Sequence, residues 1–236
     1  MNEAIVTRNL VKRYGRSRAL DGFTLSVPSH AVLGLVGRNG AGKTTWLMAV
    51  AGLVRPDAGD VDLLGLGPFD AERHSGRVSL LPQDSELPLE LSPHELLVRY
   101  ARLQGLTPSA AGASADGLLA AFNLADKARD AIRSLSHGMR QRLVVAQAFV
   151  GDPEVVLLDE PLNGLDPEEA ARMRDFILAR RGRATVVISS HLLHDLERLS
   201  THVAFVADGR VMRMDTLSAI LAENGGQTLE AAYLGR

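Results

Sequence analysis

The chain has 236 residues, and its 26 Lys and Arg against 28 Asp and Glu give a net charge of −2, so no basic character favours nucleic acid or an anionic membrane surface as a partner. It contains no Cys, which excludes a disulfide framework and a Cys-based metal site. The N-terminus MNEAIVTR has no apolar core, and no apolar run approaches the roughly 18 residues that cross a bilayer. These features predict a soluble, cytoplasmic protein of one large domain or two small ones.

Two strands are predicted near the N-terminus. Apolar residues run or alternate over residues 4–12 and 20–27, and the turn KRYGRSR separates them. Tyr14 lies in that turn and permits two interpretations. It is either a half-buried surface residue or, if the chain has a nucleotide site, a platform on which a purine ring stacks.

Residues 32–52 carry the motif around which the chain is organised. Val32–Val36 predicts a buried strand, and Thr44–Ala51 predicts an apolar helix. The turn between them matches G-x-x-x-x-G-K-[ST], whose glycines let backbone N–H groups approach phosphate oxygens at a helix N-terminus. Its Lys adds positive charge for the β- and γ-phosphates, and its hydroxyl is placed to bind Mg²⁺. The residues expected to bind the nucleoside triphosphate are Gly37, Arg38, Asn39, Gly40, Ala41, Gly42, Lys43, Thr44 and Thr45.

The middle of the chain is predicted to be mainly helical. Before it come a turn at 55–59, a strand at 61–65, and a buried strand at 78–81 that Pro82 closes just before Gln83. Helices are predicted at 92–104, 117–124 and 135–150, the first with Ser92 and the last with Ser136 as N-cap. The segment 105–117, GLTPSAAGASADG, is expected to be an exposed loop between helices. Residues 84–134 therefore form a helical insertion.

Two buried strands in the second half of the chain end in polar residues. The run 155–161 ends with Asp159 and Glu160. A carboxylate such as Asp159, held on a buried strand beside a phosphate loop, is what a Mg²⁺–triphosphate site requires, and Glu160 is free to orient and deprotonate an attacking water. His191 follows the run 184–190; alone it would be a surface histidine, but its place after a buried strand favours a role at the site.

The remaining predicted elements are a helix that begins at Asp166, short strands at 203–206 and 210–214, and a C-terminal helix at 216–223. Strands thus alternate with helices, and most strands are continuously apolar. This pattern predicts an α/β fold with a parallel sheet covered on both faces. The predicted site residues fall at the C-terminal ends of strands, as expected for an open α/β sheet.

Taken in order, these motifs resemble those of the ATP-binding subunits of ABC transporters, over essentially the whole chain. The matching features are Tyr14 for the aromatic that stacks on adenine, GRNGAGKT at 37–44 for the Walker A loop, Gln83 for the Q-loop glutamine, LSHGMRQR at 135–142 for the signature sequence, VVLLDE at 155–160 for Walker B and the catalytic Glu, NGLD at 163–166 for the D-loop, and His191 for the switch histidine. Walker A occurs in many NTPases, whereas the signature, D-loop and histidine together are close to unique to this family.

The resemblance implies the ABC ATPase fold: a P-loop NTPase core with a mainly parallel sheet, an N-terminal antiparallel β part and a helical insertion. Residues 1–236 would form a single ABC ATPase domain, with a helical subdomain at about 84–150 and a short C-terminal tail at about 216–236. It also implies ATP and Mg²⁺ as cofactors. The metal residues implied are Thr44, Gln83 and Asp159, the catalytic residues are Lys43, Gln83, Glu160 and His191, and the residues that complete the nucleotide site between two head-to-tail subunits are Ser136, Gly138 and Asp166.

Two departures from the family pattern concern the signature and the Walker A helix. The consensus LSGGQ reads LSHGM here, so His137 and Met139 replace a Gly and a Gln. Ser136 and Gly138 retain the hydroxyl and the close backbone approach, so the site is expected to function. Trp46 stands where the family more often has Leu.

The function implied is ATP hydrolysis that powers transport through a separate membrane permease. The chain would lie peripherally on the cytoplasmic face of the membrane, docked through Gln83 and the helical insertion. Residues 92–105, the MRQR of the signature and the tail LEAAYL resemble exporters of the ABC-2 type, which favours export. Three alternatives stay open: a non-transport ATPase of the same family that acts on a protein complex, a phosphate-loop kinase, and a binding module without catalysis. The intact Lys43, Asp159 and Glu160 disfavour the last.

Overall fold

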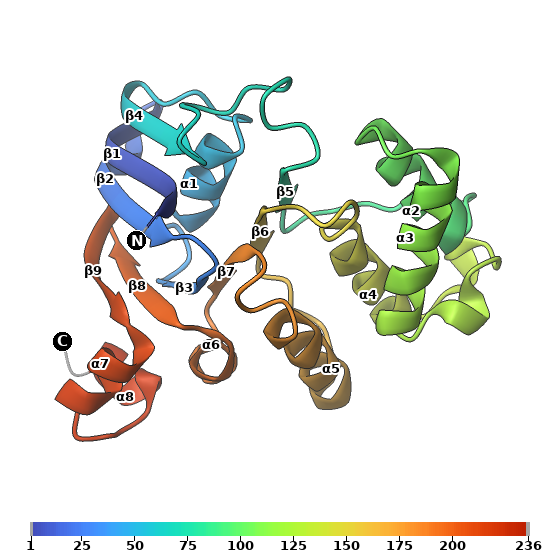
Figure 1. Cartoon of the computed structure of the whole chain (residues 1–236). Coiled ribbons are helices and arrows are strands. Elements are labelled where there is room, and N and C mark those ends of the chain that lie inside the picture. Colours follow the sequence, from blue (N-terminus) through green and yellow to red (C-terminus); the bar gives the residue numbers. More distant parts are fainter. Residues whose placement is uncertain (1, 235–236) are drawn as a thin grey trace.

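The computed structural model describes residues 2–234, and their backbone forms two β-sheets with helices packed against them (Figure 1). The smaller sheet has the order β2-β1-β4, with β1 at Glu3–Tyr14, β2 at Ser17–Pro28 and β4 at Ala58–Leu63. Both pairings in it are antiparallel. Strand β4 begins before the predicted residue 61 because Ala58 already pairs with Val11 of β1.

The larger sheet has the order β5-β6-β7-β3-β8-β9. Its strands are β3 (Val32–Val36), β5 (Val78–Leu81), β6 (Val155–Asp159), β7 (Thr185–Ser190), β8 (His202–Ala207) and β9 (Arg210–Thr216). Neighbouring strands are parallel, except that β8 and β9 are antiparallel. Every residue of β3, β6 and β7 is buried, as their continuously apolar sequences predict for a sheet covered on both faces.

The helices of the described chain follow the predicted alternation with strands. They are α1 (Lys43–Val50), α2 (Pro93–Leu103), α3 (Pro108–Ala121), α4 (His137–Gln147), α5 (Pro167–Leu178), α6 (Leu193–Leu199), α7 (Leu217–Glu223) and α8 (Leu229–Leu234). Short 3₁₀ turns lie at Ala125–Lys127 and Ile132–Ser134. None of the helices between residues 2 and 234 is long and apolar enough to cross a bilayer.

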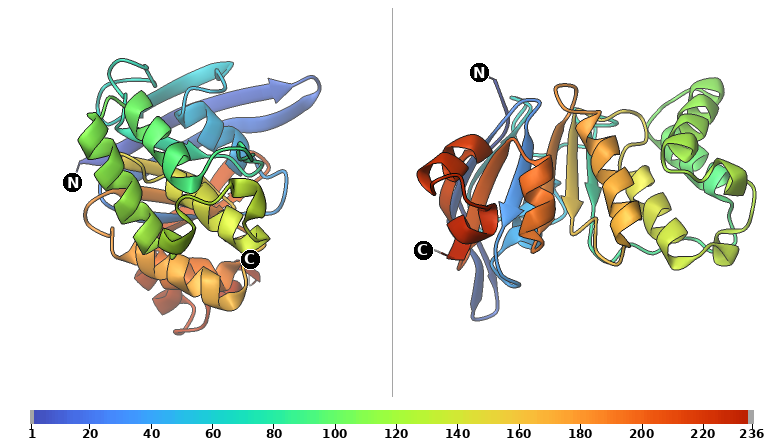
Figure 2. Two further views of the ribbon diagram at one scale, coloured as in Figure 1. Left: turned by 90° about the vertical axis from the view of Figure 1, so that its right-hand side faces the viewer. Right: turned by 90° about the horizontal axis from the view of Figure 1, so that it is seen from below.

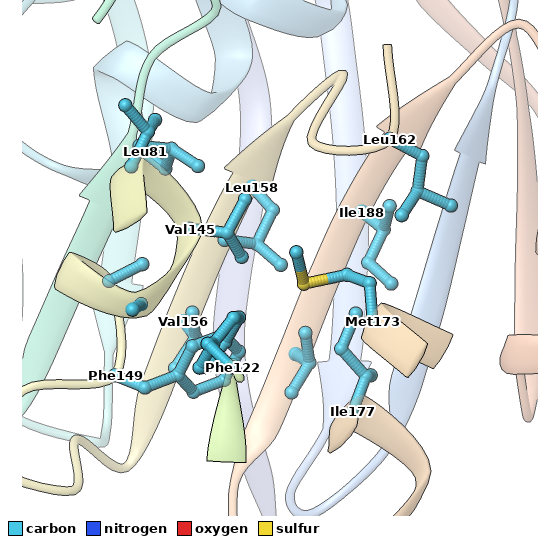
Figure 3. Packing of buried hydrophobic residues seen from close by; sticks show 14 of the residues in the cluster. Leu81, Phe122, Val145, Phe149, Val156, Leu158, Leu162, Met173, Ile177 and Ile188 are labelled. Atoms are coloured by element: carbon cyan, nitrogen blue, oxygen red, sulfur yellow. The ribbon is translucent and has the colours of Figure 1, made fainter. Parts of the chain in front are cut away.

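Alternate residues of the central strands contribute to two separate hydrophobic cores. Leu33 and Leu35 of β3 pack into a core that also contains residues of α1 and of the smaller sheet, so α1 lies between the two sheets. Val32 and Val36 point to the opposite face, where α4, α5 and α6 cover the larger sheet. Figure 3 shows part of this second core, with Met173 of α5 packed beside the apolar side chains of β6 and β7.

Helices α2 and α3 contact each other and α4, and they stand to one side of the sheets (Figure 2). The helical insertion predicted from residue 84 onward is therefore present. Its second helix begins earlier than predicted, since α3 spans Pro108–Ala121.

The prediction of an exposed loop at 105–117 is wrong for most of that segment. The Thr107 hydroxyl caps α3 by accepting a hydrogen bond from the Ala110 backbone N–H at 3.3 Å, and Pro108 occupies the first helical position, where it is well tolerated. Alanine is the best helix former, and its abundance outweighs the cost of Gly112 and Gly117. Buried residues such as Ala111 then anchor the helix to its neighbours.

The ends of several other elements agree with the sequence. The capping box between Ser92 and Glu95 is present at α2, and Ser136 caps α4. The C-terminal tail predicted at 216–236 contains α7 and, unexpectedly, α8, which packs against α6 and α7. Residues 235–236 of that tail, and residue 1 of the predicted domain, lie outside the described part of the chain.

Candidate functional site

The phosphate loop connects β3 to α1 and is held by both sheets. Gly42, at the N-cap of α1, has φ 106°, and a Cβ there would lie 2.5 Å from the backbone oxygen of Ala19 in β2. Only glycine satisfies both conditions at low cost. The loop is also bonded through its backbone, because Gly209 donates to the Ala41 oxygen at 3.0 Å and Asp21 of β2 donates to the Gly209 oxygen at 2.9 Å.

Lys43 begins α1 and points back into the loop. It is 6% exposed, and its Nζ donates to the backbone oxygens of Gly37 at 2.7 Å and Arg38 at 3.3 Å. Burial lowers the pKa of the Lys43 ammonium, while the charges of Glu160 and Asp159 act in the opposite direction. A cation in such a loop is suited to bind an anion such as a phosphate group.

Asp159, the last residue of β6, joins the loop to the sheet. Its Oδ2 accepts a hydrogen bond from the Thr44 hydroxyl at 2.6 Å, and its Oδ1 accepts one from the hydroxyl of Ser189. Ser189 lies opposite Asp159 in the parallel register of β6 and β7. Ser189 was not predicted as a site residue, because only the pairing of the two strands shows that this serine, two positions before His191, faces the carboxylate.

Glu160 follows directly and turns out of the strand. Its φ of 51° is positive, so β6 ends one residue before it. The backbone N–H of Glu160 donates to the oxygen of Ser189 at 3.1 Å and to its hydroxyl at 3.0 Å. The carboxylate side chain is only 6% exposed and lies 2.9 Å from Nδ1 of His191. His191, expected to face the γ-phosphate, thus pairs with Glu160 and remains half exposed.

A cavity of about 320 Å³ opens at these residues. Its lining consists of Ser17, Ala19, Asn39, Gly40, Ala41, Gly42, Lys43, Thr44, Thr45, Gln83, Asp159 and Glu160. Gln83, which follows β5, is therefore brought to the same place as the phosphate loop and the two carboxylates. Tyr14 is not among the described lining residues; it is 50% exposed, although Ser17 and Ala19 on the next strand do line the cavity.

The residues implied by the signature and the D-loop lie elsewhere. Ser136, Gly138 and Asp166 are outside the described cavity lining. Both polar side chains act as helix caps: the Ser136 hydroxyl accepts from the Met139 N–H at 3.2 Å, and Asp166 accepts from the Glu169 N–H at 2.8 Å. Ser136 and Asp166 therefore both act as helix N-caps, and both are exposed.

Helices α4 and α5 are in close contact beside the signature. A Cβ on Gly138 would overlap the carboxylate of Glu169, which lies 3.5 Å from the guanidinium Nε of the buried Arg142. His137, the first departure from the consensus, places its Nε2 3.1 Å from the position that a Cβ would occupy on Gly164. The imidazole thus lies against the segment predicted as D-loop in its own chain.

Trp46, the other departure, is fully buried between α1 and the smaller sheet. Its Nε1 donates to the hydroxyl of Thr7 in β1 at 3.1 Å, and its ring stacks on Phe23 of β2 at 5.6 Å between centroids. The indole therefore ties the helix of the phosphate loop to the antiparallel sheet.

The donor groups at the cavity fit a hard divalent cation. The Thr44 hydroxyl lies 2.6 Å from the Asp159 carboxylate, and Gln83 lines the same cavity. Oxygen donors of this kind suit Mg²⁺, which binds through one or two carboxylates together with water and phosphate. A phosphate loop before α1 and paired carboxylates at the end of β6 define the class of phosphate-loop NTPases.

Comparisons with known proteins agree with this class and narrow it. Residues 20–163 match the family described as ABC transporter. Daunorubicin resistance ATP-binding protein DrrA3 of Streptomyces coeruleorubidus is 38% identical over 98% of this chain and 76% of its own length. Nod factor export ATP-binding protein I of Burkholderia orbicola is 38% identical over 86% of this chain and 67% of its own. A solved ATP-binding subunit of an ABC transporter superposes with a TM-score of 0.87 at 26% identity and covers 98% of both chains.

The chain belongs to the ABC transporter family as an ATP-binding subunit, and it is an ATPase. The resemblance inferred from its motifs and the fold that it implied are confirmed.

Proposed function

We propose that this chain hydrolyses Mg²⁺-ATP at the cavity beside the phosphate loop and uses the released energy to drive export through a separate membrane permease. The observation that carries the proposal is the continuous set of contacts that runs from Thr44 through Asp159 and Ser189 to Glu160 and His191. These contacts support the proposal because they hold the proposed metal ligands and the proposed base together at one edge of the sheet.

Phosphoryl transfer requires these residues to position the substrate and to stabilise the charge that develops in the transition state. The backbone N–H groups of the loop and Lys43 would bind the β- and γ-phosphates. Thr44, Asp159 and Gln83 would hold Mg²⁺, which would supply positive charge to offset that of the phosphates. Glu160 accepts a proton from the attacking water. Its contact with His191 keeps the carboxylate in place until the γ-phosphate provides another partner for the imidazole.

Export is proposed from the relatives. The names of DrrA3 and of the Nod factor protein state drug resistance and export, and both match most of this chain. The helices α2 and α3 and the segment after Gln83 form the proposed docking face for the permease. The chain would act there at the membrane, as one ATPase domain.

A second copy of the chain is the other proposed partner. Ser136, Gly138 and Asp166 lie outside the cavity that would hold ATP, and Ser136 is exposed at the N-terminus of α4. A helix N-terminus attracts an anion, so the signature of one copy is suited to cover the γ-phosphate bound by another. Glu160→Gln, which keeps the shape of the side chain, should accumulate as a dimer with Mg²⁺-ATP and dissociate with ADP in size-exclusion chromatography.

Phosphate release tests the catalytic part. Lys43→Ala should lose ATP affinity and turnover together, because it removes the charge inside the loop. Glu160→Gln should bind ATP normally and lose at least about a hundredfold in rate, the scale of a general base. Near-normal turnover in either variant would refute the assignment of that residue.

A further inference from the structure

A second cavity, of about 570 Å³, lies between α3, the turn that follows α4, and the C-terminal end of α5. Among the described residues, its lining has no member in common with the cavity at the phosphate loop. Its volume is in the range of small-molecule sites, about 300–1,000 Å³. The lining residues that matter are Gly117, Leu118, Phe149, Asp152, Arg180 and Arg183.

Arg180 is held in this cavity by aromatic rings. The centre of its guanidinium lies 4.2 Å from the ring centroid of Phe176 and 5.1 Å from that of Phe149. Its side chain is 20% exposed, and its Nε is buried without a hydrogen-bond partner among residues 2–234. A buried donor without a partner is costly, so the described chain leaves this guanidinium incompletely satisfied.

The charges around the cavity leave an excess of positive charge. Asp152 is the nearby carboxylate, but its Oδ1 lies 3.9 Å from Nη2 of Arg180 and its side chain is 82% exposed. Arg183 adds a second cation to the lining. Burial lowers the pKa of the Arg180 guanidinium, Asp152 opposes this shift, and the charge of Arg183 adds to it. An anion between the two arginines would relieve this imbalance.

Small residues of α3 also line the cavity. A Cβ on Gly117 would meet no described atom within 4 Å, so space is open on that side. The apolar surfaces of Leu118 and Phe149 adjoin it. We propose that this cavity binds a small organic carboxylate, with its charged end on Arg180 and Arg183 and its apolar body against Leu118 and Phe149. The planar fork of a guanidinium matches a carboxylate in geometry.

Fluorine NMR with para-trifluoromethylbenzoate, titrated into the full chain, tests the proposal. The neutral para-trifluoromethylbenzamide has the same shape and is the ligand control. Because a hydrogen bond to a charged group contributes about 1.5–3 kcal/mol, the benzoate should bind at least about tenfold more tightly than the amide. Equal binding of the two, or no binding of the benzoate up to its solubility limit, would overturn the proposal.

Two glycines of α3 provide matched variants. Gly117→Leu fills the cavity, whereas Gly112→Leu is on the same helix and outside the described lining; a Cβ meets no described atom within 4 Å at either position. Both changes raise helix propensity, so both variants should fold, as circular dichroism can verify. Gly117→Leu and Arg183→Gln should each weaken benzoate binding about tenfold or more, and Gly112→Leu should leave it unchanged. Binding to Gly117→Leu that equals the parent would place the ligand elsewhere and refute the site.

Discussion

Replacing Ser189 with alanine removes a hydroxyl that contacts the carboxylate of Asp159 and the backbone N–H of Glu160 at the proposed catalytic edge. Ser189 is fully buried, its Oγ donates to Asp159 and accepts from the Glu160 N–H at 3.0 Å, and alanine fits the same space. The Thr44 hydroxyl would still hold the other oxygen of Asp159, and the Ser189 backbone oxygen would still accept from Glu160. The variant should therefore fold and bind nucleotide, with the carboxylate of Asp159 and the backbone of Glu160 less firmly held.

The size of the effect follows from the type of bond. A hydrogen bond to a charged group contributes about 1.5–3 kcal/mol, which corresponds to about a ten- to a hundredfold change. We expect kcat/KM for Mg²⁺-ATP to fall by that factor in phosphate-release assays. We also expect the Mg²⁺ concentration for half-maximal activity to rise, because Asp159 is the proposed metal ligand.

Ser190→Ala is the matched control. Ser190 is adjacent on β7 and equally buried, but its hydroxyl accepts from the Leu192 N–H at 2.9 Å, away from both carboxylates. It should keep its turnover and its Mg²⁺ dependence. If Ser189→Ala behaves like Ser190→Ala in both measurements, the hydroxyl does not position the catalytic carboxylates and the reasoning is refuted.

Two other predictions concern the smaller sheet. Thr7→Val leaves the buried indole N–H of Trp46 without its acceptor and should lower the free energy of unfolding by about 2 kcal/mol. In urea denaturation followed by circular dichroism, this loss should be smaller when the same change is made in a Trp46→Leu background. An unchanged loss in that double-mutant cycle would show that the bond contributes nothing. Tyr14→Ala should weaken ATP binding about tenfold if the ring stacks on adenine. The affinity for inorganic tripolyphosphate, measured by competition, should not change because this ligand has no adenine. Equal losses of affinity for both ligands would contradict stacking.

The sequence was most informative where one motif lies on consecutive residues. The phosphate loop is such a motif, since Lys43 and Thr44 follow the glycines directly and their placement needs no knowledge of distant segments. Asp159 was found in the same way, from the end of an apolar run. Ser189 could not be found, because its importance depends on the register between two strands that are about thirty residues apart in the chain.

Helix α3 shows a second reason why the sequence alone did not predict the structure. Its segment reads as a flexible linker because glycines, serines and a proline occur together in it. The proline and Thr107 are in fact its starting signals, and burial of Ala111 and Ala115 supplies the tertiary stabilisation that propensity alone does not reveal. Similarly, the sequence assigned Ser136 and Asp166 both a capping and a nucleotide role, and the geometry of one chain demonstrates the capping role.

The backbone bonds that run from Ala41 through Gly209 to Asp21 have a mechanical consequence. They join the phosphate loop to the turn between β8 and β9 and to β2, and Trp46 adds a side-chain bond to β1. These bonds, together with the buried core that both sheets share, hold the phosphate loop and the two sheets together. Helices α2 and α3 are joined to that body through the segment 82–92 and through α4. A rotation of α2 and α3 relative to the sheets would therefore have to bend these two connections, and Gln83 lies in the first of them.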